Sequence, residues 1–216
     1  MPLIDSATSK DVSLGDVSVT TLNDLGNFVT SGRIALPEFQ RPQVWNDQER
    51  KELVISLCLG VPIGSFLLWE FDTNCDEQKN LDIIEFPQIT TDKEKVEYLL
   101  VDGQQRMTTI AMLVNSEFSL WHKVEFRKVS KNLTRPIIQK IPKQRDEKNK
   151  VINKPDLNTI DKSCEIRISE LSGSASLPTE LNTESLKMAL SFRQSLSKTK
   201  VPVHVFRKTD PRQWVV

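Results

Sequence analysis

The stretch Val101-Asp102-Gly103-Gln104-Gln105-Arg106-Met107-Thr108-Thr109 decides the fold of this 216-residue chain. An apolar run typical of a buried strand, Tyr98–Val101, leads directly into it. After it, Met107–Val114 carries apolar side chains at helical spacing. The motif Asp102–Arg106 therefore lies at a corner between a strand and a helix. Such a helix start presents free backbone N–H groups and a partial positive charge, which suit a phosphate group.

Each residue of this motif offers a function at a phosphate site. Gly103 allows a ligand to approach the backbone closely, and Arg106 can bind phosphate oxygens through two parallel hydrogen bonds. Gln104 or Gln105 can orient a water molecule. Asp102 would repel a bare phosphate, so its presence favours binding of Mg²⁺ or of a water.

A second interpretation of the motif is purely local. Asp102 with Gln105 fits a capping box, and glycine after aspartate is common in turns. The spacing alone favours this interpretation, although a capped helix can still bind an anion. Thr108 could reach a phosphate from the first helical turn, but threonine there is more often an ordinary helix residue.

A companion motif, Phe39-Gln40-Arg41-Pro42, follows an extended segment. Arg41 precedes a helix whose start is marked by a capping box of Asn46 and Glu49, so it offers a second phosphate contact. The alternative is a surface arginine that pairs with Asp47 or Glu49 and contributes little to stability. Taken alone, this motif favours the alternative.

Composition bounds the class of protein. Apolar residues make up 38% and charged residues 27% of the chain, as in soluble globular proteins. No apolar run approaches the roughly 20 residues that span a bilayer, and Met1–Gly15 has no signal-peptide pattern. The three cysteines are scattered, which argues against a disulfide framework or zinc site. We expect a cytoplasmic protein without membrane contact.

Charge is distributed unevenly in this neutral chain. Lys123–Lys154 holds 11 Lys/Arg against 3 Asp/Glu, so the remainder is acidic. This basic segment could contact phosphate backbones; equally, it could be a solvated, partly disordered insertion. We expect a flexible lead-in over 1–17, one domain over 18–216, and an insertion or long loop over about 131–163.

The end of the chain has the pattern of a helix start. Asp210-Pro211-Arg212-Gln213 supplies a capping aspartate, a proline at the first helical position and a reciprocal glutamine. Three residues follow, too few for a stable helix. We expect the domain to be incomplete at this end and to belong to a longer protein.

Three segments in this order, Leu36–Trp45, Gly60–Ser65 and Val101–Thr109, resemble the DGQQR-motif family of GmrSD-type restriction and anti-phage proteins. The resemblance is firm over roughly residues 20–115. It implies an α+β fold, a ParB/sulfiredoxin-like mixed sheet with flanking helices. It also implies binding and Mg²⁺-dependent hydrolysis of a nucleoside triphosphate that controls a DNA nuclease domain or subunit.

Carried to this chain, the resemblance assigns catalysis to Asp102, Gln104, Gln105 and Arg106, with Asp102 as metal ligand. Phosphate or nucleotide contacts fall to Gln40, Arg41, Gly103, Arg106 and Thr108. Two alternatives stay open: a nucleotide-gated DNA-binding module without significant hydrolysis, and an inactive fragment. Direct cleavage of DNA by this domain ranks lowest, because no metal-ligand cluster accompanies Asp102.

Overall fold

The computed structural model describes residues 16–40, 44–72, 74, 78, 80–86, 89–114, 122–130, 133–172 and 176–206. Its chain divides into two compact units that alternate along the sequence. Unit 1 combines residues 1–45, 63–111 and 199–216, and unit 2 combines residues 46–62 and 112–198. The sequence predicted one domain over 18–216, and no local pattern announces this alternation.

Unit 1 is built on a mixed six-stranded sheet with the order β1-β11-β3-β5-β2-β4. Its strands are β1 (Asp16–Thr21), β2 (Ile34–Pro37), β3 (Phe66–Glu70), β4 (Ile83–Ile84), β5 (Tyr98–Asp102) and β11 (Lys200–Phe206). β11 runs parallel to β3 and β2 runs parallel to β5, whereas the other pairs are antiparallel. The predicted α+β fold with a mixed sheet is confirmed.

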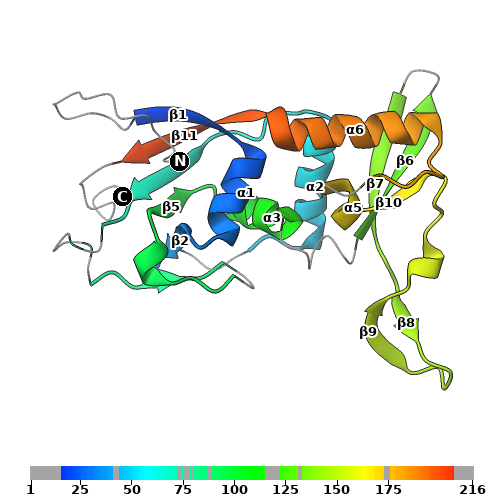
Figure 1. The fold of residues 1–216 in the computed structure, drawn as a ribbon, viewed down its shortest axis with the longest axis horizontal. Coiled ribbons are helices and arrows are strands. Elements are labelled where there is room, and N and C mark those ends of the chain that lie inside the picture. Colours follow the sequence, from blue (N-terminus) through cyan, green and yellow to red (C-terminus); the bar gives the residue numbers. More distant parts are fainter. Residues whose placement is uncertain are drawn as a thin grey trace. The chain divides into compact units, whose positions relative to one another are not determined.

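The helices of unit 1 are α1 (Leu22–Thr30), the short 3₁₀ turn η1 (Lys93–Lys95) and most of α3 (Gln104–Val114), which belongs to unit 1 as far as Ala111 (Figure 1). Thr21 caps α1, because its hydroxyl oxygen accepts the backbone N–H of Asp24 at 3.1 Å. The apolar stripe of α1 is fully buried, and so are all four residues of β2. This burial places the core of unit 1 against the strand that leads into the Asp102–Arg106 corner.

Unit 2 contains the helices α2 (Asp47–Cys58), α5 (Ile168–Ser172) and α6 (Thr183–Lys198) and the 3₁₀ turn η2 (Leu157–Thr159). Its main sheet is antiparallel, in the order β10 (Glu165–Arg167), β6 (His122–Ser130) and β7 (Leu133–Lys140). β8 (Lys143–Arg145) and β9 (Val151–Pro155) pair only with each other, in a separate hairpin.

The start of α2 confirms the predicted capping box. The side-chain oxygen of Asn46 accepts the N–H groups of Gln48 at 2.8 Å and Glu49 at 3.2 Å. In return, the Glu49 carboxylate accepts the N–H of Asn46 at 2.8 Å. These bonds satisfy N–H groups that have no partner inside the helix.

The expectation of a long loop over 131–163 is wrong. β7 pairs with β6 from Leu133 to Lys140, and β8, β9 and η2 follow within the same segment. The many polar and basic side chains of these strands made the apolar alternation typical of a strand hard to recognise in the sequence. Pro136 is tolerated because β7 lies at the edge of its sheet.

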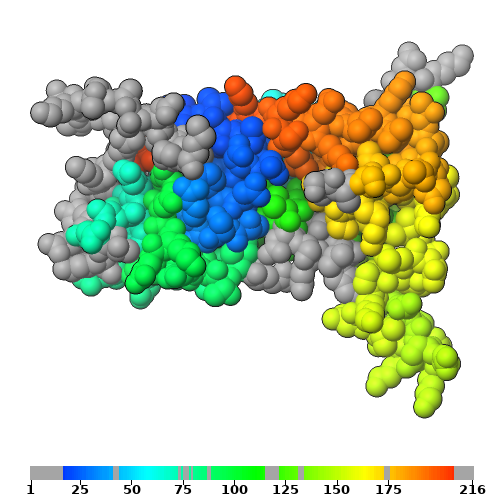
Figure 2. All heavy atoms as spheres, viewed as in Figure 1, coloured from blue at the N-terminus to red at the C-terminus, as the bar shows by residue number. Residues whose placement is uncertain are grey.

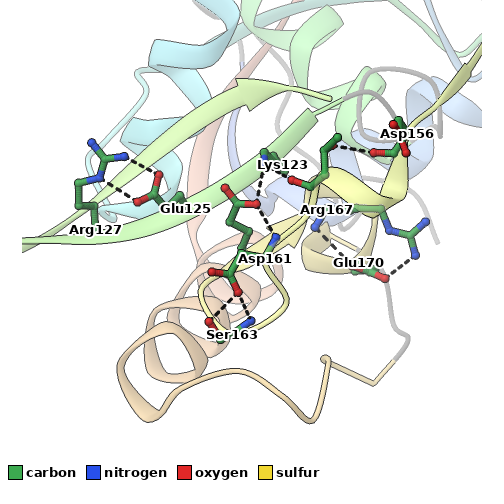
Figure 3. Close-up of polar contacts among 10 residues, drawn as sticks. Lys123, Glu125, Arg127, Asp156, Asp161, Ser163, Arg167 and Glu170 are labelled. Carbon is green, nitrogen blue, oxygen red and sulfur yellow. Dashed lines mark hydrogen bonds and ion pairs between the residues drawn. The ribbon is translucent and has the colours of Figure 1, made fainter. Parts of the chain in front are cut away.

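A buried ion pair ties β6 to β10 inside unit 2 (Figure 3). The Lys123 ammonium lies 2.6 Å from the Glu165 carboxylate, and both side chains are 10% exposed. It also donates to the Thr159 carbonyl at 2.8 Å, while Glu165 accepts the N–H of Asp161 at 2.8 Å. The first lysine of the basic segment is therefore a structural residue.

Two earlier expectations fall outside the described residues: most of the lead-in over 1–17 and the helix start at Asp210–Gln213. Within the described ranges, no helix is both long enough and apolar enough to cross a bilayer.

Candidate functional site

The corner between β5 and α3 can only be made by glycine. Gly103 has φ +95°, a conformation that side-chain-bearing residues rarely adopt. A Cβ atom there would lie 2.6 Å from the ring of Phe66 on β3. α3 starts at Gln104, and its first turn closes when the N–H of Met107 donates to the Gly103 carbonyl at 2.9 Å.

The capping-box interpretation of Asp102 and Gln105 is wrong. Asp102 belongs to β5, and Gly103 is the residue that precedes the helix. The side-chain oxygen of Gln105 accepts the backbone N–H of Trp45 at 3.1 Å, so its bond leads to another segment of unit 1. The side chain of Gln105 therefore bonds to Trp45, which is distant in sequence, and not to the helix start at Asp102, as the spacing suggested.

Gln105 carries an unused hydrogen-bond donor. The residue is 9% exposed, and its Nε2 has no hydrogen-bond partner among the residues that the structure describes. The bond from Trp45 fixes the amide orientation, since a backbone N–H must face the oxygen. A buried donor without an acceptor costs about 1–3 kcal/mol. Such a group is expected where a ligand completes the bond.

Arg106 is held in place from three sides. Its Nη1 donates to the Ile63 carbonyl at 2.6 Å, and its guanidinium lies 5.1 Å from the centre of the Phe66 ring. Nη2 lies 3.8 Å from the Asp102 carboxylate. Gly64 makes room for the guanidinium, because a Cβ at that position would lie 2.7 Å from Nη1. One edge of a fixed cation is left for a ligand.

Gln40 approaches the same corner from the loop after β2. Its Nε2 donates to the carbonyls of Leu100 at 3.2 Å and Val101 at 2.5 Å. Because its donor is already used by β5, this geometry favours a positioning role over the expected phosphate contact.

These residues surround a cavity of about 490 Å³ within unit 1. Its lining consists of the motif, its companion loop and two aromatic side chains: Phe39, Gln40, Trp45, Val101, Asp102, Gly103, Gln104, Gln105 and Arg106. The structure thus brings together Gln40 and all five residues of the 102–106 motif. Thr108 is 1% exposed and is not among the lining residues. Arg41 lies outside the described residues.

Sequence reasoning did not assign the residues that position this site. Trp45, Ile63 and Phe66 carry no local signal of a site, because their roles arise from contacts with residues some 40 to 60 positions away. Gly64 entered the sequence analysis only as part of the segment Gly60–Ser65. Its role beside Arg106 becomes visible once both segments are folded.

Asp102 is the one carboxylate among the described residues that line the cavity, and its side chain is 75% exposed. No group of three or more His, Cys, Asp or Glu side chains suited to a metal occurs in the described part of the chain. Mg²⁺ commonly binds through one or two carboxylates plus substrate phosphates and waters. Asp102 fits that kind of site, in which the substrate supplies other ligands.

The family model for the N-terminal domain of the GmrSD restriction endonuclease matches residues 22–213. This chain belongs to that family. The match includes all of unit 2, the part of unit 1 that lies within residues 22–213, and every described residue of the cavity.

A relative of this GmrSD N-terminal domain is an uncharacterized protein of Methanocaldococcus jannaschii. The two are 34% identical over 105 residues, which is 44% of this chain. The match spans 17% of that protein's length, so the activity of the longer protein does not transfer to this chain by similarity alone.

Proposed function

We propose that unit 1 binds and hydrolyses a nucleoside triphosphate and so controls DNA cleavage by a restriction or anti-phage protein. The observation that carries this proposal is the buried, unpartnered Gln105 Nε2 at a cavity lined by the whole 102–106 motif. Membership of the GmrSD family supports the setting in DNA restriction. The ParB likeness of the sheet remains part of the proposal.

The phosphates fit the N-terminal end of α3. The first N–H groups of a helix have no partner within it and attract anions. Arg106 adds a positive charge whose position is fixed before the ligand arrives, since Ile63, Phe66 and Asp102 hold the guanidinium. Fixed charges of this kind stabilise phosphoryl transfer without reorganisation in the transition state.

The remaining lining residues suit a base and a water molecule. Phe39 and Trp45 offer aromatic faces on which a nucleobase can stack. Gln104 is half-buried at the first position of α3 and can orient the attacking water. Gln105 donates its free Nε2–H to the ligand. When bound, Mg²⁺ would neutralise phosphate charge, with Asp102 as its protein ligand.

Phosphate release from each of the four ribonucleoside triphosphates with Mg²⁺ tests this proposal. The wild-type chain is compared with the Arg106→Ala variant. Arg33→Ala is the matched control, because Arg33 is also part-buried in unit 1 but pairs with Glu97 outside the cavity. We expect turnover that Arg106→Ala abolishes and Arg33→Ala keeps. Equal turnover by the Arg106 variant and wild type would contradict the proposal.

A second candidate is a nucleotide-gated DNA-binding module without significant hydrolysis. The exposed cations of the basic segment in unit 2 favour it. It predicts that nucleotide changes DNA affinity while phosphate release stays at background.

A further inference from the structure

The hairpin of β8 and β9 stands apart within unit 2. Its residues 143–155, called here the basic arm, form a separate two-stranded sheet (Figure 1). The space-filling view shows this segment as a narrow projection (Figure 2). None of these residues is buried. A two-stranded hairpin solvated in this way gains little stability of its own. Packing in a hydrophobic core therefore does not explain why these residues form an ordered hairpin.

The arm is ordered by polar contacts at both ends. At its tip, the Asp146 carboxylate accepts the N–H groups of Lys148 at 3.0 Å and Lys150 at 2.7 Å. Asn149 completes this turn with φ +62°, which asparagine tolerates. At its base, the N–H of Asp156 donates to the Pro142 carbonyl at 2.8 Å. The arm is therefore a preformed ribbon.

Three of the five basic side chains of the arm have no ion-pair partner among the described residues, whereas Arg145 donates to the Asn149 carbonyl at 3.1 Å. The arm contains five Lys/Arg and two Asp/Glu, and Asp146 serves the turn. Lys148, Lys150 and Lys154 are exposed, and none of them forms an ion pair with another described residue. Free, exposed ammonium groups on a preformed ribbon suit a polyanion, because binding costs no internal salt bridge.

We propose that the basic arm binds duplex DNA, with the two-stranded ribbon against the major groove. That groove admits a two-stranded β-ribbon, whereas the corresponding groove of duplex RNA is too deep and narrow for side chains to read. The arm has no aromatic residue on which single-stranded bases could stack. This inference rests on the proposed function, because DNA is the polyanion that a restriction module meets.

Two amide side chains add a means of contacting base edges. The side chains of Gln144 on β8 and Asn153 on β9 form no hydrogen bond with another described residue. Amide side chains can pair with adenine in the major groove. The lysines then position the ribbon on phosphates. Neighbouring residues of a strand point to opposite faces, so the register places Gln144 and Asn153 on opposite faces, and one of the two amides faces base pairs.

The test is the affinity of the full chain for a labelled duplex DNA at several salt concentrations. The arm variant is Lys148→Gln, Lys150→Gln and Lys154→Gln together. The matched control removes the same charge from exposed lysines of unit 2 outside the arm, through Lys162→Gln, Lys187→Gln and Lys198→Gln. Thermal unfolding of both variants checks that each is folded.

We expect the DNA affinity of the arm variant to depend less steeply on salt. The negative slope of log K against log salt should become shallower by about 2.7, or 0.9 per lost phosphate contact. The control variant keeps the wild-type slope. Equal slopes for the two variants, or no DNA binding by wild type, would overturn the proposal. So would equal affinity for single-stranded DNA or duplex RNA of the same sequence.

Phosphate release by the arm variant without DNA keeps this test separate from that of the proposed function. We expect the wild-type rate, because the three lysines lie in unit 2 and the cavity belongs to unit 1. If the protein bound DNA through the arm but released no phosphate, the hydrolysis proposal would be refuted and the proposal that the arm binds DNA would stand.

Discussion

The cavity of unit 1 and the basic arm of unit 2 use charged and polar side chains in opposite ways. Around the cavity, Arg106, Gln105 and Gln40 each have a fixed partner on another segment. On the arm, Lys148, Lys150 and Lys154 have no ion-pair partner within the described chain. A site for one small ligand needs fixed geometry, whereas a surface for a polyanion needs available charge.

The largest effect is expected at the corner where geometry is tightest. Gly103→Ala would combine a strained φ of +95° with a Cβ 2.6 Å from the Phe66 ring. We expect it to lower the free energy of unfolding by about 3–4 kcal/mol. Gly60→Ala is the control, because Gly60 has φ +68° but nothing within 4 Å of its Cβ position. Its strain alone should cost about 1 kcal/mol.

Urea denaturation of the two glycine variants makes the comparison. If both variants lost the same stability, the contact between a Cβ at position 103 and the Phe66 ring would not be the reason that the corner requires glycine.

A second prediction concerns two lysines of the same basic segment. Lys123→Met leaves the Glu165 carboxylate buried without its partner, and breaking a buried pair costs about 3 kcal/mol. Lys148→Met changes an exposed side chain of the arm and should cost less than about 0.5 kcal/mol. Urea denaturation of both variants would show the contrast. A similar loss of stability in the two variants would contradict the distinction between a lysine that stabilises the fold and a lysine that is free to bind a polyanion.

The local part of the fold was predictable from the sequence. Capping boxes and strand-to-helix corners depend on residues a few positions apart, so Asn46 with Glu49 and the corner at Gly103 were both found. The resemblance then placed Gln40 with the 102–106 motif, and the cavity lining agrees.

The remainder depended on contacts distant in sequence. Gln105 fits a capping box until Trp45, 60 residues away, takes its side-chain oxygen. The position of Arg106 depends on the Ile63 carbonyl, 43 residues away, which accepts a hydrogen bond from Nη1. The strands of the basic segment are stabilised by pairing with one another and with β6, so their own composition resembled a loop.

A third, smaller effect is expected on nucleotide affinity. If Trp45 stacks on the base, Trp45→Ala should weaken binding of a non-hydrolysable triphosphate by about 1–3 kcal/mol. Calorimetric titration measures this change. Trp69→Phe is the control, because Trp69 is 1% exposed in the core of unit 1 and does not line the cavity. Unchanged affinity in the Trp45 variant would exclude stacking on this residue.

The smallest effect concerns the acid stability of unit 2. Burial raises the pKa of Asp47, but the Lys51 hydrogen bond and the charges of His122 and Lys51 outweigh it and lower the pKa below 3.8. A carboxylate whose pKa is lowered by folding stabilises the folded state at pH values above its unfolded-state pKa. This stabilisation is lost as the pH falls through the folded-state pKa. Because the side chain is 46% exposed, solvent limits the gain to less than about 1 kcal/mol.

Asp47→Asn should therefore reduce stability slightly at pH 7 and less at pH 3, in urea denaturation at both values. A variant that lost equal stability at the two pH values would show that the carboxylate charge does not matter here.

The central claim is that the free Nε2 of Gln105 belongs to a ligand site, and calorimetric titration with a non-hydrolysable triphosphate and Mg²⁺ tests it most directly. Gln105→Glu keeps the size of the side chain and an oxygen that accepts the Trp45 N–H but removes the donor, and Gln104→Glu is the matched change one residue earlier. The account predicts at least about tenfold weaker binding for the Gln105 variant, because the ligand loses a buried hydrogen bond. It predicts a smaller loss for the Gln104 variant. Wild-type affinity in the Gln105 variant, or no binding by wild type, would contradict it.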